Sequence, residues 1–289
     1  MKINKPIFII GSGRSGTTVF YNILSVHPEV CWFSNYSKKF LNVKLIPMMH
    51  RVLDLPFAGN YLKTGIISNR KYFIQPREAG RIYHDYCGFV HAIKTTESDL
   101  NFATEKKFKD LIQKHLFLTG KKRFLTKQTT NTQRIRLINT MFRDAYYIHV
   151  IRDGRAVANS FLNVSWRRDT DIWWTGEKAY KWEEKGGEVI ELCGLRWKNN
   201  VNEILNNKHL FENRYIEIKY EDFVSDVKGA MKRVLDFCEL SHSKAFFDLL
   251  PQALPNRNSQ WAENLTVNQK NLLNELLESS LSELGYKLD

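Results

Sequence analysis

A glycine-rich turn near the start of the chain has the residue types of an anion-binding site. The run from Gly11 to Thr18, GSGRSGTT, follows the apolar stretch Pro6 to Ile10 and precedes apolar residues at helical spacing. This order predicts a strand, a tight turn and the start of a helix. In such a turn the backbone N–H groups and the positive end of the helix dipole favour a bound phosphate or sulfate group. A plain strand-to-helix turn is the alternative interpretation.

The turn lacks the lysine of ATP-binding loops. A Walker loop has Lys directly after its last glycine, followed by a Ser or Thr that holds Mg²⁺. Here Thr17 takes the lysine position, and the only cation of the loop is Arg14. The loop is therefore poorly suited to the β- and γ-phosphates of ATP, although a P-loop nucleotide or small-molecule kinase stays open as an alternative.

A second candidate anion site follows another predicted strand. Arg152 comes directly after the apolar stretch Ala145 to Ile151, and Ser160 lies eight residues later in a predicted helix. Arginine offers a planar fork to phosphate oxygens, and a serine hydroxyl can add a donor. The alternative interpretation is an internal salt bridge for Arg152 and a solvent-facing Ser160.

Together these motifs resemble those of bacterial-type sulfotransferases that depend on 3′-phosphoadenosine 5′-phosphosulfate (PAPS). The turn is similar to that family's 5′-phosphosulfate loop, and Arg152 with Ser160 is similar to its 3′-phosphate site. The resemblance implies transfer of a sulfuryl group from PAPS to a hydroxyl or amine, without a metal, and with adenosine 3′,5′-bisphosphate (PAP) as product. A catalytically inactive nucleotide-binding module is a further alternative.

The resemblance also implies individual nucleotide contacts. Trp197 is similar to a family position near the adenine, although a tryptophan of the core is equally consistent with the pattern. Ser259 lies in a segment that is similar to the family's C-terminal segment, which closes over the nucleotide. The implied contacts are Gly13, Arg14, Ser15, Gly16, Thr17, Thr18, Arg152, Ser160, Trp197 and Ser259.

Two cations are candidates for stabilising charge on the leaving phosphate. Arg14 lies inside the turn, and Lys127 ends a predicted strand, Arg123 to Lys127. Lys127 resembles the lysine of the family's Lys-Thr-Pro-x-Asn segment, with Thr129 in place of the proline. An ordinary surface lysine is the alternative.

The base that accepts the acceptor proton is less clearly indicated. The family's histidine position holds Thr129, and the region from Cys31 to Lys39 contains no carboxylate. Glu78 is the remaining candidate, with His84 and His91 as fallbacks. A glutamate at a helix start that only favours the helix dipole is the alternative for Glu78.

Strands that alternate with helices predict an α/β fold with a central parallel sheet flanked by helices. The resemblance implies the P-loop, nucleotide-kinase-like sulfotransferase version of that fold. We expect one domain over residues 1–289, with a Trp-rich insert or lid at about 165–188. The insert could line an acceptor site or pack on the core; its tryptophans are Trp166, Trp173, Trp174 and Trp182.

The composition limits the kinds of partner that the protein can be expected to bind. Lys and Arg exceed Asp and Glu by 12, and a surface with this positive charge attracts nucleic acid, acidic lipid or a multiply charged small ligand. No recognised nucleic-acid motif is present, so no nucleic-acid partner is expected. No apolar run approaches the roughly 20 residues of a membrane span, so we expect no integral membrane segment and a cytoplasmic location. The acceptor stays open among small molecules, glycans and lipids, and the oligomeric state is not predicted.

Overall fold

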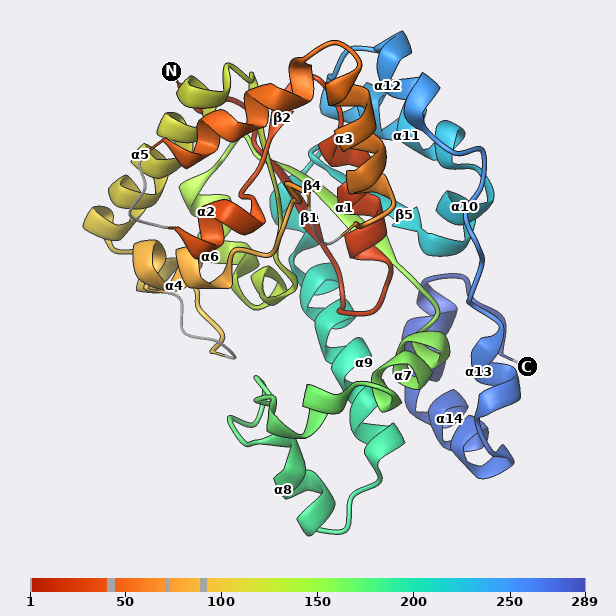
Figure 1. The fold of residues 1–289 in the computed structure, drawn as a ribbon. Helices are drawn as coiled ribbons and strands as arrows, with labels where there is room; N and C mark the ends of the chain where they lie inside the picture. Colours follow the sequence, from red (N-terminus) through yellow and green to blue (C-terminus); the bar gives the residue numbers. More distant parts are fainter. Residues whose placement is uncertain (1, 41–44, 71–72, 89–92, 289) are drawn as a thin grey trace.

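The structure is a computed structural model, which describes residues 2–40, 45–70, 73–88 and 93–288. Its centre is a five-stranded parallel sheet with the order β2-β3-β1-β4-β5 (Figure 1). The strands are β1 Ile7–Ile10, β2 Val30–Cys31, β3 Arg123–Lys127, β4 Tyr146–Ile151 and β5 Tyr215–Lys219. The predicted α/β fold with a central parallel sheet is confirmed; only β2, which is two residues long, has no signal of its own in the sequence.

Helices cover both faces of this sheet (Figure 1). The longer ones are α1 Thr17–Ser25, α3 Ala58–Ile67, α4 Gly80–Cys87, α5 Phe102–Thr119, α6 Ile135–Met141, α7 Gly154–Leu162, α9 Val189–Asn207, α11 Val227–Cys238 and α14 Val267–Glu283. The shorter ones are α2 Asn35–Lys39, α8 Ala179–Glu184, α10 Tyr220–Ser225, α12 Lys244–Leu249 and α13 Gln260–Asn264. The 3₁₀ helices are η1 Ile46–Asp54, η2 Glu97–Asp99, η3 Thr129–Arg134, η4 Ser165–Asp169 and η5 Lys208–Phe211.

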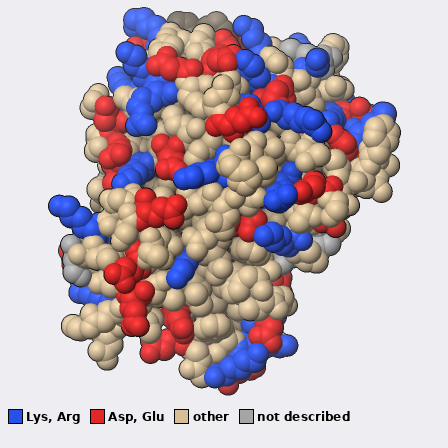
Figure 2. Space-filling view, turned by 180° about the vertical axis from the view of Figure 1, so that it is seen from behind, with Lys and Arg blue, Asp and Glu red and all other residues tan. Residues whose placement is uncertain are grey.

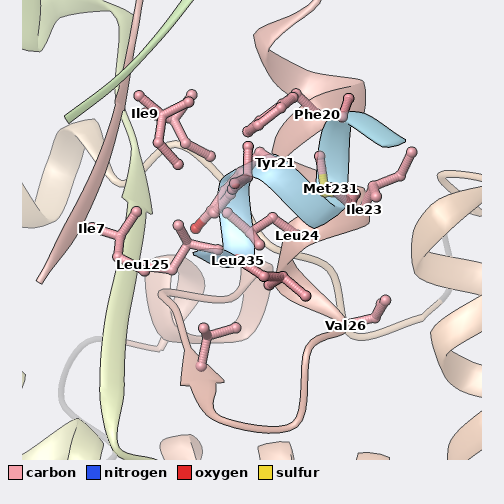
Figure 3. Close-up of a cluster of buried hydrophobic side chains, with 14 of the residues drawn as sticks. Ile7, Ile9, Phe20, Tyr21, Ile23, Leu24, Val26, Leu125, Met231 and Leu235 are labelled. Carbon is pink, nitrogen blue, oxygen red and sulfur yellow. The ribbon is translucent and has the colours of Figure 1, made fainter. Parts of the chain in front are cut away.

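Strand β1 is fixed by apolar packing on both of its faces. Ile7 and Ile9 point into one core cluster together with side chains of α1 and α11, as the close-up in Figure 3 shows. Phe8 and Ile10 point into the opposite cluster, which α4, α5 and α6 cover. A strand that is buried on both faces is typical of a parallel sheet. The end of β1 is therefore held in one position.

The strand order places the candidate site residues at one edge of the sheet. β1 lies between β3 and β4, so the chain leaves β1 for one side of the sheet and later returns to the other. In open parallel sheets the crevice at the carboxyl ends of the strands beside this reversal is the usual ligand site. The turn after β1, Lys127 at the end of β3 and Arg152 after β4 all lie there.

A third apolar cluster lies beyond this edge of the sheet. It joins α7, α9, α13 and α14, and Trp197 is fully buried within it. The insert predicted at about 165–188 contains η4 and α8 and extends away from the sheet next to α9 (Figure 1). Its own small cluster consists of Ile172 and Ala179 with Leu192 of α9. Helix α9 takes part in both arrangements, because its Ile204 packs on a face of the sheet while its Trp197 lies in this third cluster.

The surface carries charges of both signs. Figure 2, seen from behind, shows Lys and Arg side chains interspersed with Asp and Glu over much of that face. Within the described ranges, no helix combines the length and the apolar character that crossing a membrane requires.

Four histidines are buried in the described part of the chain, His27 among them, and the other three show the larger pKa shifts. His50 contacts the Trp32 ring, His115 lies beside Phe33, and His149 bonds to the Tyr215 hydroxyl. Burial lowers the pKa of each of these imidazoles to about 3, from the ordinary value of 6.5. All three are therefore neutral in the folded protein at neutral pH.

These histidines predict a loss of stability in mild acid. Because their pKa values are lower in the folded chain, the unfolded chain binds more protons below about pH 6.5, and the free energy of unfolding falls as pH falls. Each histidine contributes a slope of about 1.4 kcal/mol per pH unit between its two pKa values. Urea unfolding between about pH 6 and pH 5 measures the slope. His115→Gln should lower the slope of the unfolding free energy against pH by about 1.4 kcal/mol per pH unit. His84→Gln, at an exposed position, should leave the slope unchanged. An unchanged slope in His115→Gln would contradict this account.

Candidate active site

The turn between β1 and α1 presents an open helix end. Gly16 has a left-handed backbone with φ of 85°, and its missing side chain leaves room for the ring of Tyr220. No side chain caps the start of α1, and its first turn contains no acidic residue. The first N–H groups of a helix have no acceptor within the helix. The start of α1 therefore has N–H groups that are available to an anion.

Arg152 is a nearly buried cation with neutral partners. It is 8% exposed. Its Nη1 donates to the Arg14 carbonyl oxygen at 3.2 Å, its Nη2 to the Arg257 carbonyl oxygen at 2.7 Å, and its Nε to Asn258 Oδ1 at 3.2 Å. The guanidinium also lies 4.5 Å from the centre of the Tyr220 ring. These contacts fix the orientation of the group without neutralising its charge.

The charge of Arg152 is not balanced by an ion pair with a carboxylate in the described part of the chain. Burial lowers the pKa of Arg152, while Glu221 and Asp153 nearby act in the opposite direction. Asp153 itself pairs with Arg155 at 2.8 Å. The salt bridge that was the alternative interpretation of Arg152 is therefore absent from the described residues. A buried cation of this kind is suited to an external anion.

Arg152 and the start of α1 line one large cleft. The cleft has a volume of about 680 Å³, and its walls also contain Arg14 and Ser160. Arg14 Nε donates to Ser160 Oγ at 2.9 Å, which joins the turn to α7. The two anion sites predicted from the sequence thus open into the same space.

A second, smaller cavity of about 290 Å³ lies at the same edge of the sheet. Lys127, Glu78, Trp173 and Trp174 line it. Lys127 is 5% exposed, and its Nζ donates to Thr18 Oγ1 at 3.0 Å and pairs with the Glu78 carboxylate. Lys127 is therefore not an ordinary surface lysine, because it joins the start of α1 to a carboxylate within this cavity.

The turn separates the two spaces. Arg14, Thr17 and Thr18 line both the large cleft and the small cavity. A group bound at the start of α1 can therefore be reached from either side. This arrangement suits the transfer of a group between two ligands, since both reacting molecules must meet at one point.

Comparison with known proteins identifies the family. The model of a sulfotransferase family matches residues 6–244 of the chain. The chain belongs to the sulfotransferase family. A curated relative, the omega-hydroxy-beta-dihydromenaquinone-9 sulfotransferase Stf3 of Mycobacterium bovis, is 20% identical over a 323-residue alignment that covers 97% of this chain and 75% of the relative. Family and fold together make the protein a sulfuryl-transfer enzyme.

Solved structures with the same fold are bacterial sulfotransferases. STF9 from Mycobacterium avium is 14% identical with a TM-score of 0.62, and the match covers 100% of this chain and 79% of STF9. The sulfotransferase domain of the Synechococcus PCC 7002 olefin synthase is 17% identical with a TM-score of 0.54, over 100% of this chain and 97% of that domain. At these identities the comparison confirms the predicted sulfotransferase fold.

The structure places Trp197 of this sulfotransferase, which the resemblance puts near the adenine, in the core. Its side chain is fully buried, and its Nε1 donates to the carbonyl oxygen of Arg152 at 2.9 Å. A side-chain carbon added at Gly154 would lie 2.6 Å from its ring, so the packing is tight. Trp197 belongs to the core, and its hydrogen bond to the Arg152 carbonyl helps to position the Arg152 backbone.

Three further residues selected from the sequence, Ser15, Ser259 and His84, lie outside the linings of the two spaces. Ser15 is buried within the turn, and Ser259 is exposed beside Asn258; neither lines the large cleft or the small cavity. His84 is mostly exposed, bonds to Asp85 and lines neither space. His91 lies outside the described residues.

Asn200, which no sequence motif indicates, links several parts of the site. Its Oδ1 accepts hydrogen bonds from Trp173 Nε1 at 3.1 Å and Thr132 Oγ1 at 3.2 Å, and its Nδ2 donates to Ser12 Oγ at 3.4 Å. Asn200 lies one helical turn after Trp197 in α9. An asparagine on a helix has no sequence signal of its own, so this role appears only in the folded chain.

The core position of Trp197 can be tested by stability. Trp197→Phe should lower the free energy of unfolding by about 1–3 kcal/mol, because the buried Arg152 carbonyl loses its donor. Equilibrium urea unfolding measures this change. Trp174→Phe is the matched control, since Trp174 is only partly buried in the insert and its replacement should change stability less. Full stability of Trp197→Phe together with lost nucleotide affinity would restore the interpretation of Trp197 as a base-stacking residue.

Proposed function

We propose that this sulfotransferase transfers the sulfuryl group of PAPS to a hydroxyl acceptor, with PAPS in the large cleft and the acceptor in the small cavity. One observation carries the proposal. Two separate anion sites, the open start of α1 and the unbalanced guanidinium of Arg152, line the same cleft. PAPS carries anionic groups at its 5′ and 3′ positions, so its charge distribution fits two sites better than one.

Each end of the nucleotide has its own residues. We assign the 5′-phosphosulfate to the turn from Gly13 to Thr18, where backbone N–H groups and Arg14 meet. We assign the 3′-phosphate to Arg152, with Ser160 as a second donor. Arg152 is already held by three hydrogen bonds, so binding requires little further ordering of its side chain.

Residues of the chain itself can supply the catalysis. The reaction forms a bond between the acceptor oxygen and sulfur and breaks the bond between sulfur and the bridging oxygen of the 5′-phosphate. The acceptor proton passes to a base, and negative charge grows on the leaving phosphate. Arg14 and Lys127 lie where they can stabilise that charge, since Arg14 lines both spaces and Lys127 lines the small cavity and donates to Thr18 of the turn.

Glu78 is the base that this geometry favours. It lines the small cavity, its side chain is 38% exposed, and it pairs with Lys127. Lys127 therefore contacts both the proposed base and Thr18 of the turn. This double contact holds the carboxylate next to the start of α1, so that proton acceptance and sulfuryl transfer take place at neighbouring points.

The donor assignment predicts which nucleotides bind. Calorimetry should give micromolar or tighter binding of PAP without Mg²⁺, and weaker binding of ATP with Mg²⁺. Arg152→Ala should lower PAP affinity about 10- to 150-fold, equivalent to roughly 1.5–3 kcal/mol for one charge-assisted contact. Affinity for adenosine 5′-phosphosulfate, which lacks the 3′-phosphate, should stay unchanged in this variant. Tight binding of ATP with Mg²⁺ and no binding of PAP would contradict the proposal. An equal loss of affinity for PAP and for adenosine 5′-phosphosulfate would show that Arg152 only supports the fold.

The catalytic assignment predicts a loss of turnover rather than of affinity. Arg14→Ala and Lys127→Ala should each lower kcat on the order of 10²–10³-fold, with a smaller change in PAP affinity, because both cations act on charge that grows during transfer. PAPS hydrolysis to PAP, followed by chromatography, measures turnover without a known acceptor. Lys122→Ala is the matched control, since this lysine is 73% exposed at the other end of β3. Unchanged turnover in Lys127→Ala would remove Lys127 from the site.

A further inference from the structure

We infer that the acceptor is a small polyhydroxylated ring, a saccharide or a cyclitol, which stacks on Trp173 and Trp174 of the insert. The inference rests on the proposed function, because it names the acceptor class of the same site. The comparisons do not give this class: the curated relative is named for a menaquinone derivative, and it is only 20% identical. The walls of the small cavity indicate this class.

The small cavity is limited in size and mostly polar. Its volume of about 290 Å³ is less than half that of the large cleft. Among the described residues that line it, only Phe161, Trp173 and Trp174 have large apolar side chains. A long isoprenoid or acyl chain would need a continuous apolar wall. The cavity instead offers an aromatic side opposite many hydrogen-bonding groups.

The two tryptophans form a fixed aromatic corner. Their rings lie 5.8 Å apart and meet at 86°. Trp173 Nε1 is bonded to Asn200 Oδ1, and Asn200 also contacts Ser12 of the turn. Trp173 is thus oriented by the same residue that contacts the anion-binding turn. A pyranose or cyclitol ring presents C–H groups on its face, and such a face packs well on an indole.

One buried polar atom among the residues that line the cavity still lacks a partner. Gln133 lines the cavity and is 6% exposed, and its Oε1 has no hydrogen-bond partner in the structure. Asp171, Thr129 and Thr130 line the same cavity. Asp171 already pairs with Lys178 at 2.6 Å, and Thr130 Oγ1 accepts from Gln128 Nε2 at 2.9 Å, so both are held in place and keep further hydrogen-bonding capacity. A phenol would bring only its reacting hydroxyl and would use little of this polar lining. An acceptor with several hydroxyls can bond to the polar lining while one hydroxyl faces Glu78.

The chemistry balances for such an acceptor. One hydroxyl oxygen of the ring bonds to sulfur, its proton passes to the Glu78 carboxylate, and the sulfur–oxygen bond to the 5′-phosphate breaks. The products are a sulfate ester of the ring and PAP. The remaining hydroxyls take no part in bond making and serve to orient the ring.

The experiment compares three acceptor classes at saturating PAPS, and chromatography measures both PAP release and the sulfated product. The first class, saccharides and cyclitols, is represented by methyl glucoside, trehalose and myo-inositol. Phenol represents the aromatic acceptors, and farnesol represents the isoprenoid acceptors. We expect sulfation of at least one saccharide or cyclitol above the rate without acceptor, and no faster reaction of phenol or farnesol. Trp174→Ala should lower kcat/KM for that acceptor about tenfold or more, because the acceptor ring loses one stacking contact and is oriented less well. Trp174→Phe, which keeps a ring, should restore most of it.

Two controls separate the possible failures. Trp182→Ala changes a tryptophan of the same insert that does not line the cavity, and it should keep its kcat/KM. PAP affinity should be unchanged in all three variants. Saturation-transfer NMR with PAP present reports ring binding even without turnover. If PAP binds but no saccharide or cyclitol is bound or sulfated, or if phenol or farnesol reacts faster, the acceptor class is wrong while the proposed function stands. If PAP itself does not bind, the proposed function fails.

Discussion

Arg152 holds a positive charge at the carboxyl end of β4, where the residue is only 8% exposed. Taking a charge out of water costs several kcal/mol unless an opposite charge replaces the lost hydration. Its partners in the described part of the chain are two carbonyl oxygens and one amide oxygen. The chain therefore maintains an electrostatic cost that a bound anion would offset. Much of the surrounding structure serves this position: Trp197 holds the Arg152 carbonyl, and Gly154 leaves space for the Trp197 ring.

The turn between β1 and α1 lies next to Arg152 and separates the large cleft from the small cavity. Because Arg14, Thr17 and Thr18 line both the large cleft and the small cavity, the turn is a thin wall between these two spaces. Lys127 and Asn200 then connect the wall to the small cavity, the first through Thr18 and the second through Ser12. In the function that we propose, nucleotide binding and sulfuryl transfer therefore depend on the same few residues. A rigid β1, buried on both faces, holds that wall in place.

Local sequence patterns predicted the parts of the site that local chemistry determines. The strand, glycine turn and helix start at Gly11 to Thr18 follow from residue types within one short run, and the strand that ends at Lys127 follows from its apolar pattern. The pairing of Lys127 with Glu78 could be proposed only as two separate candidates, because 48 residues separate them and tertiary folding brings them together. Trp197 was ambiguous for a different reason. A tryptophan on a helix can face a ligand or a core, and only the packing of α7, α9 and α14 decides between them.

The central claim is that one nucleotide spans the large cleft from the start of α1 to Arg152. A crystal structure of the full chain with PAP bound tests it most directly. We expect the 5′-phosphate at the backbone N–H groups of Gly16 and Thr17, and the 3′-phosphate bonded to the Arg152 guanidinium and the Ser160 hydroxyl. The small cavity should stay open to an acceptor. A nucleotide bound in the small cavity, or one whose 3′-phosphate lies away from Arg152, would contradict the account.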